Sequence, residues 1–225
     1  MSAGLGLYLV ADGMGGQAAG KRASEEATRI VTQALEASSG GGAGGEERLR
    51  DAIDLANRHV WQLSQSEPGL LGMGTTIAAV LIADGMAYIG HVGDSRVYRL
   101  RDGKIERLTR DHSFSAELAE RGIELRDDRV GSRYAHLLTR AVGIAPTVEV
   151  ELTSQRIEVK DTYIICSDGI YGLVDPSEIQ QIIEADADLA HVCVAIVARA
   201  NAAGGSDNST VIVLRVEPNE AGERA

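Results

Sequence analysis

The sequence predicts an α+β fold with antiparallel sheets, and three observations support this prediction. Apolar, β-leaning segments pair around Asp-Gly turns at 83–85 and 101–103, as hairpins do. Segments with helical periodicity occur in two groups, 18–63 and 176–203, which separate the strand-rich stretches. Strands and helices segregated in this way favour antiparallel sheets over a doubly wound parallel sheet. The 225 residues fit one domain with a full hydrophobic core.

The N-terminal part predicts a strand followed by a pair of helices. Residues 7–10 form a short apolar strand. The segments 18–37 and 49–63 each place apolar residues at helical spacing, which predicts two amphipathic helices. The glycine-rich stretch 38–47 is a flexible connection between them, so the two helices are expected to form a hairpin.

The remaining chain predicts an antiparallel meander, a surface excursion and a second pair of helices. The excursion covers 111–134, which is charged and irregular, with a short helix around 115–121. The later helices cover 176–185 and 187–203, and 217–225 is expected to be a polar, disordered tail. The expected strands are 75–82, 86–92, 97–100, 104–108, 148–152, 161–166 and 210–216.

The composition argues against several classes of protein. A formal net charge of −11 disfavours a nucleic-acid partner, which would need a basic face. No apolar run reaches the length of about 18 residues that a membrane span needs, and no signal peptide is recognisable. Cys166 and Cys193 lie in apolar segments without zinc-site spacing, so we expect reduced core thiols in a cytoplasmic protein.

Four acids share one local pattern, at the rim of a strand beside glycine or another small residue. They are Asp12, Asp94, Asp168 and Asp207. For any one of them a plain turn is the leading alternative, because Asp-Gly is a common turn dipeptide. Four carboxylates brought together would repel one another unless cations neutralised them. Oxygen-only ligands select Mg²⁺ or Mn²⁺ rather than zinc or copper.

Six segments, in a fixed order, carry a resemblance to a known family. They are VADGMGG (10–16, with GKRAS at 20–24), GMGTTIAAVLI (72–82), HVGDSRVYRLRDGKIERLTRDHS (91–113), LLTRAVG (137–143), YIICSDGIYGLV (163–174) and GGSDNSTVIVL (204–214). In these segments the chain resembles a bacterial member of the metal-dependent protein phosphatases, the PPM family (type 2C). The resemblance extends over nearly the whole chain, from Leu7 to Val216.

This resemblance implies an architecture and a reaction. The architecture is a sandwich of two antiparallel β-sheets flanked by helix pairs, in α-β-β-α layers, as a single domain over 1–216 with a mobile flap at about 111–137. The reaction is hydrolysis of phosphoserine and phosphothreonine in proteins by a metal-activated water. The partners would be phosphorylated proteins, with a cognate kinase as one candidate. There are two alternatives. One is a catalytically weakened phosphatase-fold protein that binds metals and partners, and the other is a metal phosphodiesterase.

The resemblance also assigns roles to individual residues. Asp12 would bridge two Mn²⁺ or Mg²⁺ ions, and the carbonyl of Gly13 would bind one of them. Asp168 and Asp207 would hold the other ion, and Asp94 with Asp168 a third, weaker one. The catalytic group would be a metal-bound water held by Asp12, Asp168 and Asp207, because neither cysteine precedes a phosphate-binding loop.

The chain departs from the family pattern at two places near its beginning. Gln17 stands where the family often has a histidine, and glutamine cannot act as a proton donor in the way an imidazolium does. Only MSAGLG precedes the first strand, where the family usually has another strand with a phosphate-binding arginine and a metal-binding acid. A late start, a weakened variant and a metal-binding protein are competing explanations, of which we favour the first. Lys21 and Arg22 are weak candidates for phosphate binding, against the alternative of a solvated helix start.

Overall fold

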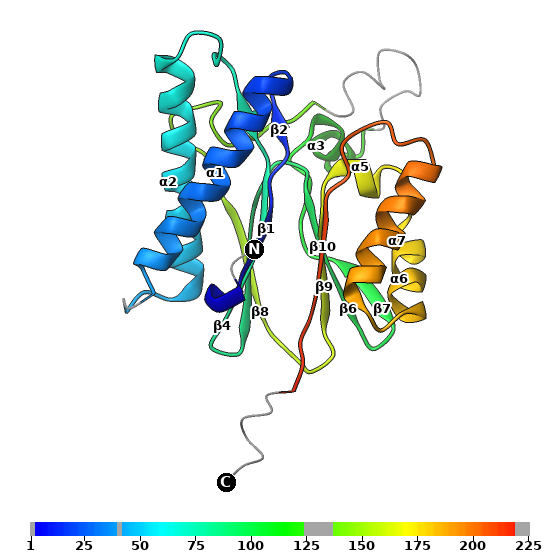
Figure 1. Cartoon of the computed structure of the whole chain (residues 1–225). Helices are drawn as coiled ribbons and strands as arrows, with labels where there is room; N and C mark the ends of the chain where they lie inside the picture. Colours follow the sequence, from blue (N-terminus) through cyan, green and yellow to red (C-terminus); the bar gives the residue numbers. More distant parts are fainter. Residues whose placement is uncertain (1–2, 40–41, 124–136, 219–225) are drawn as a thin grey trace.

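Two four-stranded antiparallel sheets form the centre of the computed structural model, which describes residues 3–39, 42–123 and 137–218 (Figure 1). The first sheet has the order β1-β4-β5-β8 and the second the order β10-β9-β6-β7. The strands of the first sheet are β1 (Leu7–Val10), β4 (Ile77–Ala83), β5 (Met86–Val92) and β8 (Glu151–Arg156). The strands of the second are β6 (Arg96–Arg101), β7 (Lys104–Arg107), β9 (Thr162–Cys166) and β10 (Val211–Arg215).

A pair of helices covers the outer face of each sheet (Figure 1). The pair on the first sheet is α1 (Gln17–Ala37) and α2 (Gly45–Ser66), and the pair on the second is α6 (Pro176–Ala185) and α7 (Leu189–Ala202). The short elements are η1 (Ala3–Leu5), β2 (Gly13–Met14), β3 (Gly74–Thr75), α3 (Phe114–Glu120) and α5 (Asp168–Tyr171). The predicted α-β-β-α sandwich is therefore confirmed.

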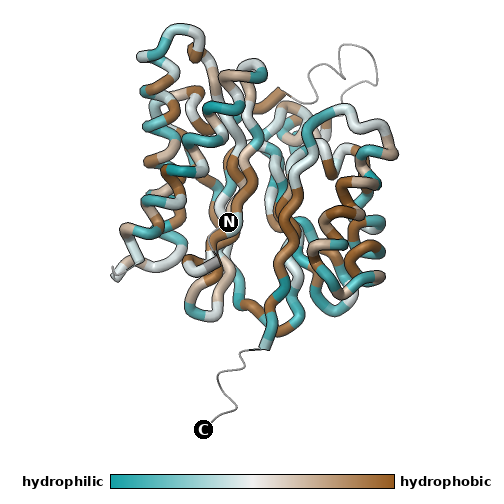
Figure 2. The backbone as a smooth tube through the Cα atoms, in the orientation of Figure 1, coloured by the Kyte–Doolittle hydropathy of each residue, from teal (hydrophilic) through white to brown (hydrophobic). Residues whose placement is uncertain are grey.

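Three apolar clusters hold the layers together. One lies between the first sheet and its helices, where α1 buries Ala23, Ala27, Val31 and Leu35 at a spacing of one helical turn. A second joins the other sheet to α6 and α7. The third lies between the two sheets, whose strands carry the apolar residues that Figure 2 shows in brown. Strands buried on both faces read as continuous apolar runs, as in β9, all of whose residues are buried.

The structure corrects one predicted strand and leaves two predicted segments outside the described residues. The strand expected at 148–152 is β8, Glu151–Arg156, which pairs with β5 through Met86↔Arg156 and His91↔Glu151. The outer part of the expected flap, 124–136, and the tail residues 219–225 lie outside the described part of the chain. Within the described residues no helix is long and apolar enough to cross a membrane.

Candidate active site

The backbone of Asp12 is fixed by hydrogen bonds to the start of β4. Its N–H donates to Thr76 Oγ1 (2.9 Å), and its carbonyl accepts from the Thr76 N–H (2.8 Å) and from Thr75 Oγ1 (2.9 Å). Thr76 Oγ1 in turn contacts Ser95 Oγ at 2.7 Å, next to another of the four acids. Because these contacts join segments more than 60 residues apart, they hold the end of β1 in one place relative to the residues that precede β4.

The residue after Asp12 has to be glycine because two backbones meet there. Gly13 pairs with Thr75 in the small β2–β3 ladder. A Cβ on Gly13 would overlap the carbonyl oxygen of Gly20, which lies in the first turn of α1. Gly15 and Gly16 follow with φ of 105° and 89°, a region that favours glycine, and they turn the chain sharply into α1.

The other three acids come from three separate connections. Asp94 lies in the turn between β5 and β6, and Asp168 begins α5 directly after β9. Asp207 lies in the loop before β10, where it is exposed and its Oδ1 accepts from the Asn208 N–H at 2.7 Å. The structure thus brings together four predicted residues that are spread over almost 200 positions of the sequence.

The electrostatics show how closely the acids face one another. Burial raises the pKa of Asp12 to about 7, and the charges of Asp168, Asp207 and Asp94 add to this rise. Burial and then the charge of Asp168 raise the pKa of Asp94 to about 6. Asp168 Oδ1 is buried and has no hydrogen-bond partner among the described residues. Crowded carboxylates with an unsatisfied oxygen are suited to a hard cation, so the residues present fit the expected metal ions.

The raised pKa of Asp12 predicts how the stability of the metal-free protein depends on pH. The folded protein keeps the Asp12 proton up to about pH 7, whereas the unfolded chain releases it near the ordinary aspartate pKa of 3.8. Between these values the fold binds more protons, so its free energy of unfolding falls as pH rises. In EDTA at pH 8 we expect the free energy of unfolding of Asp12→Asn to exceed that of the wild type by about 1–3 kcal/mol, after allowing for solvent screening.

Urea unfolding of both chains at pH 5 and pH 8 measures this difference. At pH 5 the gain is expected to shrink, because the folded wild type is then protonated at Asp12. Added Mn²⁺ should stabilise the wild type more than Asp12→Asn. An equal or larger gain at pH 5 would contradict the raised pKa of Asp12.

A second polar cluster, of His91, His112 and Glu151, has a structural role. His112 Nδ1 accepts from the Gly93 N–H (3.1 Å), and its Nε2 contacts Glu151 Oε2 (3.2 Å). His91 Nε2 contacts the carbonyl of Arg110 (2.7 Å), and the two rings stack with centroids 4.7 Å apart at 17°. Lone pairs in parallel stacked planes do not converge on one ion, so we interpret the cluster as a support for the turn before Asp94.

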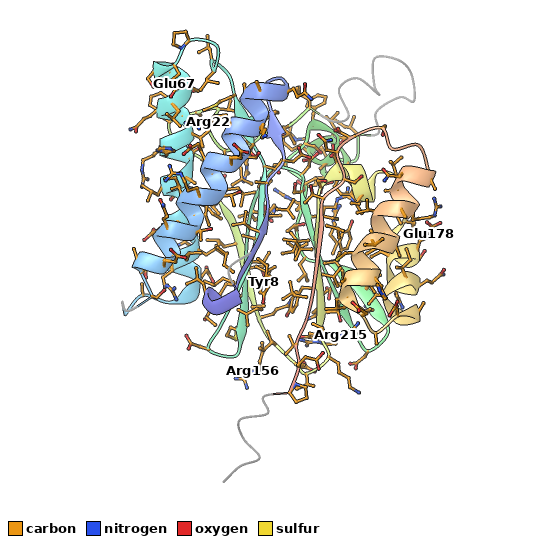
Figure 3. All side chains as sticks on the ribbon, in the orientation of Figure 1. Tyr8, Arg22, Glu67, Arg156, Glu178 and Arg215 are labelled. Atoms are coloured by element: carbon orange, nitrogen blue, oxygen red, sulfur yellow. The ribbon has the colours of Figure 1, made fainter. Side chains whose placement is uncertain are left out.

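The remaining sequence candidates lie on α1, and no hydrogen bond or ion pair among the described residues joins them to the four acids. The exposed side chains of Lys21 and Arg22 pair within α1, with Glu25 at 3.8 Å and with the mostly buried Glu26 at 3.3 Å. Figure 3 labels Arg22 on this helix. Gln17 is the exposed first residue of α1.

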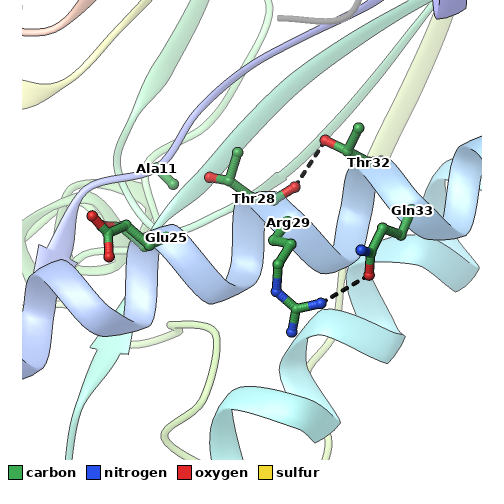
Figure 4. A pocket seen from close by; sticks show the side chains of 7 residues that line it. Ala11, Glu25, Thr28, Arg29, Thr32 and Gln33 are labelled. Atoms are coloured by element: carbon green, nitrogen blue, oxygen red, sulfur yellow. Dashed lines mark hydrogen bonds between the residues drawn. The ribbon is translucent and has the colours of Figure 1, made fainter.

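One of the surface hollows runs along α1 and contains none of the four acids. It lies beside Ala11, and Thr28 and Arg29 are among its lining residues (Figure 4). Arg29 donates to Gln33 Oε1 at 2.8 Å within this hollow. The hollow therefore offers no carboxylate of the aspartate cluster.

Sequence reasoning missed two residues that support the acids. Thr75 and Thr76 bind the backbone of Asp12.

Known proteins resemble this chain in sequence over most of its length. The family model described as "Protein phosphatase 2C" matches residues 2–200. The serine/threonine phosphatase stp of Listeria monocytogenes is 34% identical over 221 residues, which are 97% of this chain and 88% of that protein. The serine/threonine protein phosphatase PstP of Mycobacterium tuberculosis is 35% identical in an alignment of 228 positions, which covers 98% of this chain and 42% of PstP.

Solved structures share this fold over most of the chain. The crystal structure of the Mycobacterium tuberculosis serine/threonine phosphatase PstP/Ppp superimposes with a TM-score of 0.84 at 32% identity, over 94% of this chain and 88% of that one. The catalytic domain of PstP in complex with two manganese ions gives a TM-score of 0.81 at 33% identity, over the same shares. The chain belongs to the PPM (protein phosphatase 2C) family of serine/threonine protein phosphatases.

Proposed function

We propose that the chain hydrolyses phosphoserine and phosphothreonine in proteins at the cluster of Asp12, Asp94, Asp168 and Asp207. The observation that supports this most directly is the meeting of these four acids, with one buried oxygen of Asp168 left without a partner. The acids come from three connections of one rigid sandwich and from the end of β1, which is an arrangement suited to holding ions in fixed positions.

The cofactors are two or three Mn²⁺ or Mg²⁺ ions. Asp12 and the carbonyl of Gly13 would hold the first, Asp168 and Asp207 with Asp12 the second, and Asp94 with Asp168 a third. Bound there, the cations supply the charge that activates a water near neutral pH and offsets the charge on the phosphoryl oxygens. The three backbone and hydroxyl contacts of Asp12 keep its carboxylate in place while the substrate changes charge.

A protein thiol is not the nucleophile in this proposal. Burial raises the pKa of Cys166 to about 12, so its thiol stays protonated at neutral pH. Burial also raises the pKa of Cys193, which lies on α7. Both cysteines are free thiols. We propose in addition that the enzyme is cytoplasmic, on the ground of its low cysteine count.

The segment 111–137 is proposed as a flap beside the acids, within a single domain over 1–216. Its two ends meet at a defined base. Ser113 bridges to Leu138, and the Phe114 N–H donates to the Leu137 carbonyl at 2.8 Å. This base supports the proposal of a flap, which would contact phosphorylated proteins, a cognate kinase among them.

Alanine substitution of Lys21 and of Arg22 tests the two weak candidates for phosphate binding. Their side chains are 75% and 48% exposed and already pair with acids one turn along α1. Since both cations are already engaged with acids of their own helix, we expect less than a twofold change in KM and kcat on a phosphopeptide. An increase of about tenfold or more in KM would instead assign phosphate binding to them.

A further inference from the structure

Arg96 lies at the end of a strand ladder beyond which two of the four acids are found. The antiparallel ladder of β6 and β9 ends at the pair Arg96↔Cys166. Asp94 is two residues before Arg96 and Asp168 is two residues after Cys166, so both acids lie just beyond the same end of this ladder. The pKa of Asp94, which burial and then the charge of Asp168 raise, agrees with this placement. The contacts of Arg96 therefore bear on both acids.

The guanidinium of Arg96 is held by contacts with three side chains. Its Nε and Nη2 donate to the two carboxylate oxygens of Asp111 at 2.9 and 2.6 Å, and its Nη1 donates to the Tyr98 hydroxyl at 3.1 Å. Its central carbon lies over the ring of Tyr171, 3.5 Å from the ring centre. A bidentate pair with a carboxylate fixes the plane of a guanidinium, and an aromatic ring beneath that plane is attracted to it. Arg96 thus holds the Tyr171 ring in place.

The helix that carries Tyr171 also carries Asp168. This helix, α5, has only the four residues Asp168–Tyr171, and a single helical turn is not stable in isolation, so its orientation depends on contacts with the rest of the fold. Ile170 anchors it in the apolar cluster beside α6 and α7. The contact between Arg96 and the Tyr171 ring attaches it to the start of β6 as well.

We propose that Arg96 is a positioning residue, which holds α5 against the start of β6 and so fixes the spacing between Asp168 and Asp94 that cation binding needs. The proposal rests on the proposed function above. Groups behind a metal ligand orient it, and their loss typically lowers metal affinity by about 10- to 100-fold. The competing explanation is that Arg96 only stabilises the fold, and it predicts no effect on the metal affinity of the folded protein.

Direct Mn²⁺ titration of the full chain, with free Mn²⁺ followed by electron paramagnetic resonance, tests the proposal. Arg96→Lys keeps the positive charge but loses the planar group that pairs with Asp111 and covers the Tyr171 ring. We expect this variant to lower Mn²⁺ affinity by about tenfold. Thermal unfolding in EDTA measures its effect on stability separately.

Arg101→Lys is the matched control. Arg101 lies at the other end of β6, its side chain is 22% exposed against 19% for Arg96, and its Nε and Nη2 donate to both oxygens of Asp161, each at 2.6 Å. Asp161 precedes β9 whereas Asp168 follows it, so the control pair lies at the opposite end of the same two strands. Arg101→Lys should lower the Tm in EDTA and leave Mn²⁺ affinity within about twofold.

Tyr171→Leu tests the same contact from its other side, because it removes the ring and changes no charge. It should lower Mn²⁺ affinity by about tenfold as well. The double variant, Arg96→Lys with Tyr171→Leu, should lose less than the product of the two single losses, because residues that act through one contact are not additive. If Arg96→Lys does not fold, Tyr171→Leu is compared with Arg101→Lys in its place.

The possible results separate the proposal from its basis. Wild-type Mn²⁺ affinity in Arg96→Lys or in Tyr171→Leu, or an equal loss of affinity in Arg101→Lys, would overturn the positioning role. Losses that multiply in the double variant would show that Arg96 does not act through the Tyr171 ring, and they too would overturn it. Wild-type protein that binds no Mn²⁺ would overturn the proposed function instead.

Discussion

Replacing Asp168 or Asp207 with alanine is expected to lower kcat/KM on a phosphopeptide in the presence of Mn²⁺ by about 10³-fold or more. Hydrolysis of phosphate monoesters is so slow in water that the enzyme depends on the charge its cations supply. Asp168 is the stronger candidate for a cation ligand, because its buried Oδ1 has no partner among the described residues. Its charge also raises the pKa of both Asp12 and Asp94. Alanine removes the ligand oxygens completely, so Mn²⁺ affinity is expected to fall with the activity.

Asp102→Asn serves as the control for these variants. Asp102 lies at the exposed β6–β7 turn with φ of 50°, a conformation that asparagine also tolerates, and it should keep full activity. Activity that survives Asp168→Ala and Asp207→Ala would contradict the mechanism. Wild-type protein that binds Mn²⁺ without turnover would support the binding-module alternative. Preference for bis(para-nitrophenyl) phosphate over para-nitrophenyl phosphate would support a phosphodiesterase.

Features of the fold that depend on local chemistry were predictable from the sequence. The predicted helix 176–185 has the bounds of α6 because Pro176 follows Asp175, whose side chain accepts from the Ser177 N–H at 2.8 Å. An N-cap followed by proline fixes a helix start from neighbouring residues alone. The hairpins β4–β5 and β6–β7 were predictable for the same reason, since Asp84 and Asp102 adopt the positive φ that their turns need.

Elements that depend on distant partners were not predictable. β8 reads ELTSQR, which has little apolar alternation, and it is a strand because it pairs with β5 at the edge of the sheet. The ladder of β2 and β3 joins Gly13 to Thr75, and two-residue strands carry no periodicity. Pairings of this kind appear only when the whole sheet is assembled.

The residues of the candidate site also divide into those with a local sequence signal and those that depend on distant partners. The strand-rim pattern selected the four acids, because a rim aspartate beside a small residue is a local signal. Thr75 and Thr76 act through contacts across the fold, and no spacing in the sequence relates them to Asp12. The supporting residues of such a site therefore become visible only when the acids have been placed in three dimensions.

Gly20→Ala is expected to destabilise the protein, although alanine favours helices over glycine by about 1 kcal/mol. A Cβ at this position would lie 2.6 Å from the Gly13 oxygen, 2.7 Å from the Gly13 carbonyl carbon and 3.0 Å from the Met14 nitrogen. All three are backbone atoms that cannot rotate away, so α1 must move from β2. Overpacking of this kind costs about 1–3 kcal/mol or more, which outweighs the gain in helix propensity.

Thermal unfolding and Mn²⁺ titration together measure this effect. A net loss of about 2 kcal/mol corresponds to a decrease in Tm of about 4–8 °C for a domain of this size. Gly42→Ala is the control, because a Cβ there meets nothing within 4 Å, and its Tm should not decrease. Since the displaced backbone includes Gly13, beside Asp12, Gly20→Ala should also weaken Mn²⁺ binding. A Tm that rises in Gly20→Ala would mean that the two backbones have room to separate, and that the glycine is not required for their contact.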